Sequence, residues 1–133
     1  KIARGWSERD IWNLYVMHAE LIRDTLKYYK NNRMGSPVLG ENEEGDEIVD
    51  GWGENNTHEI WDRKLDKMIW AFDKVVQIGK GDLQFQSLNH WTEDRQDALI
   101  NIYGEDRVLS KEEVEKMFKG MQLYVTHIFA IWD

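Results

Sequence analysis

The chain contains no cysteine, and this absence excludes both a disulfide framework and any metal site built on thiolates. A cysteine-free composition fits a reducing compartment, so the sequence predicts a cytoplasmic protein. No apolar run approaches the roughly 20 residues that a membrane-spanning helix needs, and residues 1–9 lack the apolar core of a signal peptide. We therefore expect a soluble protein without a membrane partner.

Several catalytic motifs are also missing from the sequence. There is no G-x-x-x-x-G-K-[ST] phosphate loop and no G-x-S-x-G elbow, and His58-Glu59 lacks the second histidine of a zinc-protease helix. These absences favour a binding protein over an enzyme, with no metal or other cofactor. The enzymatic alternative is a helical, metal-dependent nucleotide pyrophosphatase, which would need carboxylates from two helices to converge on magnesium.

Negative charge exceeds positive charge in this sequence, with 25 Asp and Glu against 17 Lys and Arg in 133 residues. A net charge of -8 disfavours binding to double-stranded nucleic acid, because that affinity comes mainly from cations on phosphates. An acidic run at 41–50 does not have the ligand spacing of an EF-hand, so a solvated loop is expected there. The alternative role for this run is mimicry of DNA in an inhibitor of a nucleic-acid-binding protein.

Helix-capping patterns divide the chain into three long helical segments. Each begins with a side chain that caps a helix and an acidic residue three positions later. The three pairs are Ser7 and Asp10, Asn56 and Glu59, and Ser110 and Glu113. They predict helices at about 7–30, at 57–78 with Gly79 and Gly81 as stops, and from 110 to the C-terminus.

Each predicted helix has an apolar face at the 3.6-residue period. In the first helix this face comprises Ile11, Leu14, Tyr15, His18, Leu21, Ile22, Leu26 and Tyr29, with His18 as a core histidine. In the second it comprises Trp61, Leu65, Met68, Ile69, Phe72, Val75 and Val76. In the third it comprises Val114, Met117, Phe118, Met121, Tyr124, Val125, Ile128 and Trp132. These faces predict three helices that pack on one another.

The segments between the long helices have weaker patterns. Residues 92–103 predict a short fourth helix that Gly104 ends, whereas 31–55 contains five glycines and the only proline. We expect a long acidic loop at 31–55, or a small hairpin with arms at 37–39 and 47–49. The sequence thus predicts one all-α domain, 1–133, in which three long amphipathic helices and a short fourth form a bundle.

A second stripe on the 57–78 helix is the main candidate for a functional surface. Arg63, Lys67, Trp70 and Lys74 line up opposite the apolar face, which is unusual in so acidic a chain. Tryptophan beside Arg and Lys is typical of protein interfaces and of sites that bind bases and phosphates. The alternative is a solvated face whose cations pair with aspartates, with Trp70 covered by a loop.

The first helix offers a similar row away from its predicted core. Arg9, Trp12, Val16 and Arg23 share that side, and a continuous patch would result if this row adjoined the one on 57–78. Arg4 and Arg9 flank a helix N-terminus, where free N–H groups favour anions, although ordinary salt bridges would also explain them. The candidate contact residues are therefore Arg4, Arg9, Trp12, Arg63, Lys67, Trp70 and Lys74.

Three stretches resemble a group of small, uncharacterised proteins encoded by tailed bacteriophages. Residues 4–14, RGWSERDIWNL, are similar to that group's R-G-[WY]-S-[DE]-R-D-x-W-x-L motif. The resemblance continues through Trp61, Leu65, Lys67, Met68, Ile69, Ala71 and Phe72, and then through Gly120, Leu123, Tyr124, Phe129 and Trp132. The chain departs from the group in its long acidic insertion before Trp52.

The resemblance implies a phage accessory protein in the bacterial cytoplasm and brings no established activity with it. By analogy we expect interference with a host or defence system, through binding of a host or phage protein or capture of a small anionic nucleotide. Exposed aromatic side chains are also compatible with a homo-oligomer.

Overall fold

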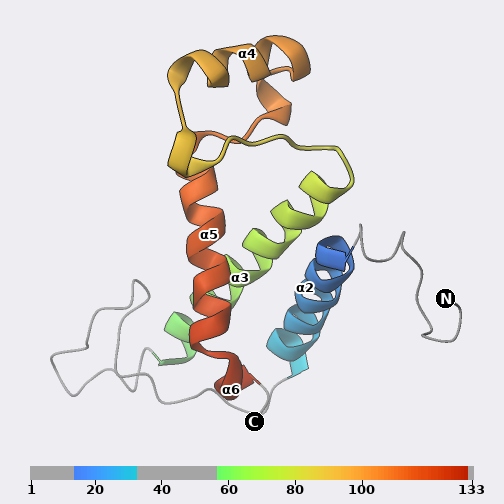
Figure 1. Ribbon diagram of the computed structural model, residues 1–133. Helices are drawn as coiled ribbons and strands as arrows, with labels where there is room; N and C mark the ends of the chain where they lie inside the picture. Colours follow the sequence, from blue (N-terminus) through green and yellow to red (C-terminus); the bar gives the residue numbers. More distant parts are fainter. Residues whose placement is uncertain (1–13, 33–56, 132–133) are drawn as a thin grey trace, which may run out of the picture.

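A computed structural model describes residues 14–32 and 57–131, which are all-α (Figure 1). The helices are α2 (Leu14–Asn32), α3 (Thr57–Gly79), α4 (Glu93–Tyr103), α5 (Lys111–Thr126) and α6 (Ile128–Ile131), with 3-10 turns η3 (Leu88–His90) and η4 (Glu105–Arg107). The predicted bundle of three long helices and a shorter one is confirmed. The expected start of the first helix, at 7–13, and the acidic loop or hairpin lie outside the described residues.

Within this described part, no helix combines the length and the apolar character that crossing a lipid bilayer requires.

Helix α3 supplies most of the core because it packs against both α2 and α5. Its predicted apolar face is confirmed, and Trp61, Leu65 and Met68 have no exposed surface. The first core cluster joins residues of α2, α3 and α6: Ala19, Leu26, Trp61, Leu65, Met68, Phe72, Val76 and Ile131. A second cluster joins α3 to α5 and the segment between them: Ala71, Leu83, Leu109, Val114 and Met117. Burial on two sides makes α3 the central helix.

The N-terminus of α5 has the capping box that the sequence predicts. The Glu113 N–H donates to Ser110 Oγ at 3.2 Å, and the Ser110 N–H donates to Glu113 Oε1 at 3.0 Å. Of the predicted apolar face, Val114 and Met117 are buried. Phe118 and Val125 are exposed instead, because the face in contact with α3 is narrower than the apolar stripe.

The prediction that this helix continues to the C-terminus is wrong, because the chain turns at His127. The His127 N–H still donates to Leu123 O at 3.0 Å, but the residue then leaves helical geometry with φ -109 and ψ 14. Its ring packs edge-on against Trp61 at 5.5 Å between centroids, and Nε2 lies 3.5 Å from the Nζ of buried Lys64. The turn therefore lets α6 place Ile131 on the first cluster.

The short helix α4 lies beyond one end of the long helices (Figure 1). Thr92 caps its start by accepting the Arg95 N–H at 3.2 Å, and Gly104, with φ +95, ends it as predicted. Two buried glutamines connect α4 to the segments that flank it, since Gln86 Nε2 donates to Gln96 Oε1 at 3.1 Å and Gln96 Nε2 donates to Leu109 O, before the start of α5, at 3.0 Å. These bonds satisfy buried amides without a large apolar contact.

Only part of the predicted apolar face of α2 packs on the core, where Leu26 is buried and Ile22 and Tyr29 lie against the first cluster. Ala19 and Leu26 are buried, whereas His18, expected in the core, is exposed, as are Leu14 and Leu21. Both sides of α2 carry apolar residues, so periodicity alone does not distinguish them. The small side chain of Ala19 and the charged partners on α3 decide which side packs.

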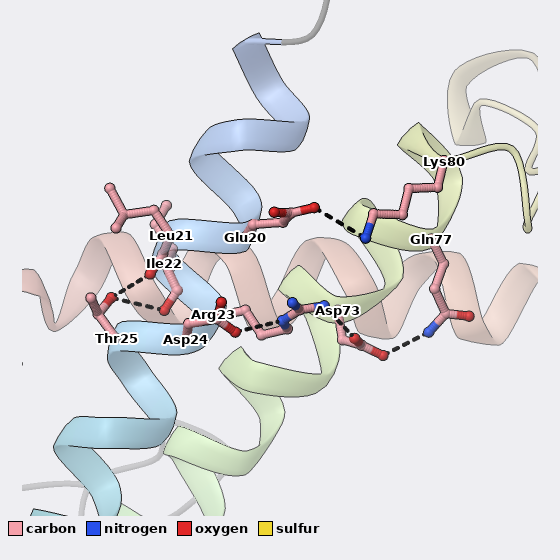
Figure 2. A network of polar contacts seen from close by, with 9 residues as sticks. All are labelled: Glu20, Leu21, Ile22, Arg23, Asp24, Thr25, Asp73, Gln77 and Lys80. Atoms are coloured by element: carbon pink, nitrogen blue, oxygen red, sulfur yellow. Dashed lines mark hydrogen bonds and ion pairs between the residues drawn. The ribbon is translucent and has the colours of Figure 1, made fainter.

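Those charged partners form a seam along the antiparallel helices α2 and α3 (Figure 2). Arg23 donates to Asp73 Oδ1 at 3.0 Å, Lys30 to Asp66 Oδ1 at 2.6 Å, and Lys80 approaches Glu20 Oε1 at 3.2 Å. Arg23 also donates to Asp24, and this hydrogen bond, with the bond to Asp73, raises its pKa above the usual value. Partly exposed pairs of this kind stabilise weakly, but together they specify which face of α2 meets α3.

Two glycines allow the helices to approach closely. A Cβ at Gly120 of α5 would lie 2.5 Å from Lys67 O and 2.6 Å from Ala71 Cβ on α3. At the other contact, Gly79 of α3 lies against Val16 of α2. Gly79 ends α3 without a positive φ, and the left-handed conformation occurs at Gly81 instead, with φ +84.

The orientation of α2 can be tested by a pair of substitutions. Leu26→Ala should lower the free energy of unfolding by about 2–5 kcal/mol, because it opens a cavity in the first cluster. Leu21→Ala on the exposed side should change it by less than about 0.5 kcal/mol. Urea denaturation of both variants measures the difference, and a larger loss for Leu21→Ala than for Leu26→Ala would mean that α2 packs through the other face.

The contact between α3 and α5 can be tested at Gly120. Alanine in a helix normally stabilises by about 1 kcal/mol relative to glycine. Gly120→Ala should instead destabilise by about 1–2 kcal/mol, because the added methyl group forces the two helices apart. Thermal and urea unfolding report the change, and Lys119→Ala on the exposed side of α5 is the control. A more stable Gly120→Ala variant would disprove the close contact.

Candidate functional site

The structure describes four of the seven predicted contact residues, all on α3. Arg63 is exposed, whereas Lys67, Trp70 and Lys74 are half-buried. The row that the sequence predicts therefore runs along one side of α3, next to α5. The other three candidates, Arg4, Arg9 and Trp12, lie outside the described residues.

Trp70 lies at the edge of the core. One part of its side chain packs against the second cluster, which holds the indole in place. Two ammonium groups lie over the ring, Lys116 Nζ at 4.3 Å and Lys74 Nζ at 5.3 Å from its centroid. Such cation–π contacts stabilise by about 0.5–1 kcal/mol where solvent has access. Trp70 is thus neither a free aromatic contact nor a core residue, and its ring contacts lysines from two different helices.

A groove of about 530 Å³ adjoins this arrangement, and its lining includes Lys116, which lies over Trp70, and Lys67 of the basic row. Residues from α3 and α5 line it: Lys67, Glu112, Glu115, Lys116, Lys119, Gly120, Gln122 and Leu123. The volume is in the range of small-molecule sites, about 300–1,000 Å³. The α3–α5 crossing therefore forms a concave surface next to the basic row.

The lining of the groove combines cations with hydrogen-bond acceptors. Three lysines, Lys67, Lys116 and Lys119, and two glutamates give it one net positive charge, and Lys74 lies nearby over Trp70. Lysine offers three donors to an anion, while a carboxylate accepts hydrogen bonds from N–H or O–H groups. Gly120 and Leu123 add a small apolar part. Such a surface suits a ligand that has both an anionic group and donors.

Sequence reasoning missed the contribution of α5 to this site. Glu112, Lys116 and Lys119 follow the i, i+4, i+7 spacing of one helix side, which a search for polar stripes would have found. What the sequence alone does not provide is the packing of that side next to Lys67 and Trp70. Gly120 decides this packing, because it brings the backbones of α3 and α5 together.

The predicted row on the first helix has a different role where it is described. Val16 lies against Gly79, and Arg23 is hydrogen-bonded to Asp73, so both face α3. The prediction that they lie away from the core face is wrong, because the opposite side of α2 is the exposed one. Because Val16 and Arg23 contact α3, they do not contribute to the candidate site, which is formed by residues of α3 and α5.

In residues 14–32 and 57–131, no group of three or more His, Asp or Glu side chains is arranged to hold a metal ion.

The role of Trp70 in stability can be separated from that of a core tryptophan. Trp70→Ala should lower the free energy of unfolding by about 1–2 kcal/mol, since part of the ring is solvated. Trp61→Ala should cost about 3–5 kcal/mol, because Trp61 is fully buried. Urea denaturation compares the two variants. A loss at Trp70 as large as that at Trp61 would make Trp70 a core residue.

In comparisons with known proteins, no family model, no curated protein and no solved structure matches the chain. Function therefore has to be inferred from the chemistry of this groove and from the fold that forms it.

Proposed function

We propose that this protein is a binding protein that captures a small anionic nucleotide in the groove between α3 and α5. The observation that supports the proposal is the convergence of Lys67, Lys116 and Lys119 on one concave surface in a chain with a net charge of -8. An acidic chain repels anions at long range, so a local group of lysines is needed to bind one. Binding, and not chemistry, is the proposed activity.

The mixed lining supports a nucleotide over a simple phosphate ion. Lysine ammonium groups would bind the phosphates, and Glu112 and Glu115 would accept hydrogen bonds from the amino groups of a base or the hydroxyls of a ribose. Trp70 would act indirectly, because its ring holds Lys74 and Lys116 in place. Each ring contact lowers the entropy that a free lysine side chain would lose on binding.

The resemblance to tailed-phage proteins supports the biological setting of the proposal. A phage accessory protein in the bacterial cytoplasm would interfere with a host or defence system by removing a nucleotide signal. The competing mode is direct binding of a host or phage protein through the same basic surface. Enzymatic turnover of nucleoside triphosphates is the remaining alternative, and it predicts magnesium-dependent product formation.

The proposal predicts salt-dependent binding that charge reversal in the groove removes. Isothermal titration calorimetry with ATP, GTP and a cyclic dinucleotide should detect binding of at least one of them at 50 mM salt. Binding should weaken by about tenfold at 300 mM salt, because exposed charges are screened. Lys67→Glu combined with Lys116→Glu should weaken it by at least tenfold, or about 1.4 kcal/mol.

Arg95→Glu combined with Arg107→Glu is the matched control, because it changes the net charge by the same amount and both residues are exposed and lie outside the groove lining. It should retain the affinity of the parent chain. Adenosine and pyrophosphate, tested separately, should bind more weakly than the intact nucleotide. Equal loss in the control and the groove variant would contradict the assigned site, and no binding by any of the three nucleotides would contradict capture.

A further inference from the structure

The two glutamates that line the groove, Glu112 and Glu115, are each followed four positions later by a lysine of the same lining. A glutamate and a lysine at this spacing normally attract each other on the surface of a helix. In residues 14–32 and 57–131, however, neither carboxylate takes part in a hydrogen bond or an ion pair. Both carboxylates therefore keep their full capacity to accept hydrogen bonds from a ligand.

Trp70 explains why Glu112 has no ion pair with Lys116. The Lys116 ammonium group lies over the indole of Trp70, with Nζ at 4.3 Å from the ring centroid. This cation–π contact competes with the ion pair that the spacing on α5 would otherwise favour. Trp70 belongs to α3, so the packing of the two helices, and not α5 alone, leaves this carboxylate without a partner.

The charges of the groove are ordered along α5. Glu112 lies in the first turn of this helix, and Lys119 follows about 10 Å farther along the axis. The backbone of Lys67 meets α5 at Gly120, the residue after Lys119. Glu115 lies between these ends, about 6 Å from Lys119 along the axis. The groove therefore has an acceptor end at Glu112 and a cationic end at Lys67 and Lys119.

We propose that the base of the captured nucleotide is guanine, that Glu112 binds its Watson–Crick edge, and that Lys67 and Lys119 bind the phosphates. This inference rests on the proposed capture of a nucleotide in the groove. Guanine has two adjacent donors on that edge, N1–H and the N2 amino group, and the two oxygens of one carboxylate accept both. Glu112 suits the base better than Glu115, because a base and its phosphates lie at opposite ends of a nucleotide.

The other bases do not match a carboxylate in this way. Adenine and cytosine each have one amino donor beside a ring nitrogen that is itself an acceptor, and its lone pair would face the second carboxylate oxygen. Uracil has a single N–H between two carbonyl oxygens, which would also face the carboxylate. A site that places an acceptor opposite an acceptor disfavours that ligand. The carboxylate of Glu112 is thus sufficient to select guanine.

Glu112→Gln tests this role, because it removes the charge and replaces one acceptor oxygen with a donor amide. Isothermal titration calorimetry with GTP, ATP and xanthosine triphosphate (XTP) gives the ratios of the dissociation constants. The parent chain should bind GTP about tenfold more tightly than ATP or XTP, because only guanine has the paired donors. Glu112→Gln should instead bind XTP more tightly than GTP. Xanthine has a carbonyl oxygen in place of the N2 amino group, and the glutamine amide donates to it.

Glu115→Gln is the matched control, because it makes the same change of charge on the same helix and in the same groove. It should change the affinities for the three nucleotides by a common factor and leave their ratios unchanged. An unchanged preference for GTP in Glu112→Gln, or its loss in Glu115→Gln, would overturn the role of Glu112.

The same titrations separate this inference from the proposed function. Equal binding of ATP and GTP by the parent chain, or tighter binding of ATP, would overturn guanine recognition and leave nucleotide capture intact. Binding of neither would also overturn the inference. If the cyclic dinucleotide then fails to bind as well, capture itself is contradicted.

Discussion

The structure depends on the requirement that α3 bury two faces at once. Trp61, Leu65 and Met68 fill the core toward α2 and α6, while Ala71 meets α5 on the other side. A helix in this position has room for close neighbours only where side chains are small. Gly120 and Ala71 provide that space on the α5 side, and Gly79 provides it where Val16 of α2 approaches. The close approach of backbones at these glycines determines how near the long helices lie to one another, and the ion pairs between α2 and α3 help to specify which face of α2 is buried.

The position of the basic row follows from that packing. Asp66 and Asp73 of α3 pair with α2, whereas the basic row of α3 lies on the side next to α5. Lys67 and Trp70 lie on this side and meet Lys116 across the contact. The half-buried indole is fixed by the second cluster below it, and its open part attracts lysines from two helices. Packing of the core thereby gathers like charges that would otherwise remain apart.

Local patterns were sufficient to predict most of the secondary structure. Ser110 and Glu113 predict the start of α5, and Gly104 predicts the end of α4. The apolar period of 57–78 predicts the buried face of α3. These predictions succeed because caps, stops and amphipathic stripes act within a few residues. Periodicity was only partly right for α2, because it predicted the core position of Leu26 but also predicted core positions for His18 and Leu21, which are exposed. Both faces of that helix are apolar, and only the aspartates and the glycine on α3 distinguish them.

The sequence by itself determined the all-α class and the extent of the described long helices, apart from the break at His127. It also determined the basic row, which comprises Arg63, Lys67, Trp70 and Lys74. All of these are properties of single helices. The tertiary structure decided which face of α2 is buried, that Trp70 is half-buried, and that Lys116 and Lys119 join Lys67 around one groove. These features depend on contacts between residues some 50 positions apart. Such contacts are set by the shape of the packed helices, which no local pattern encodes.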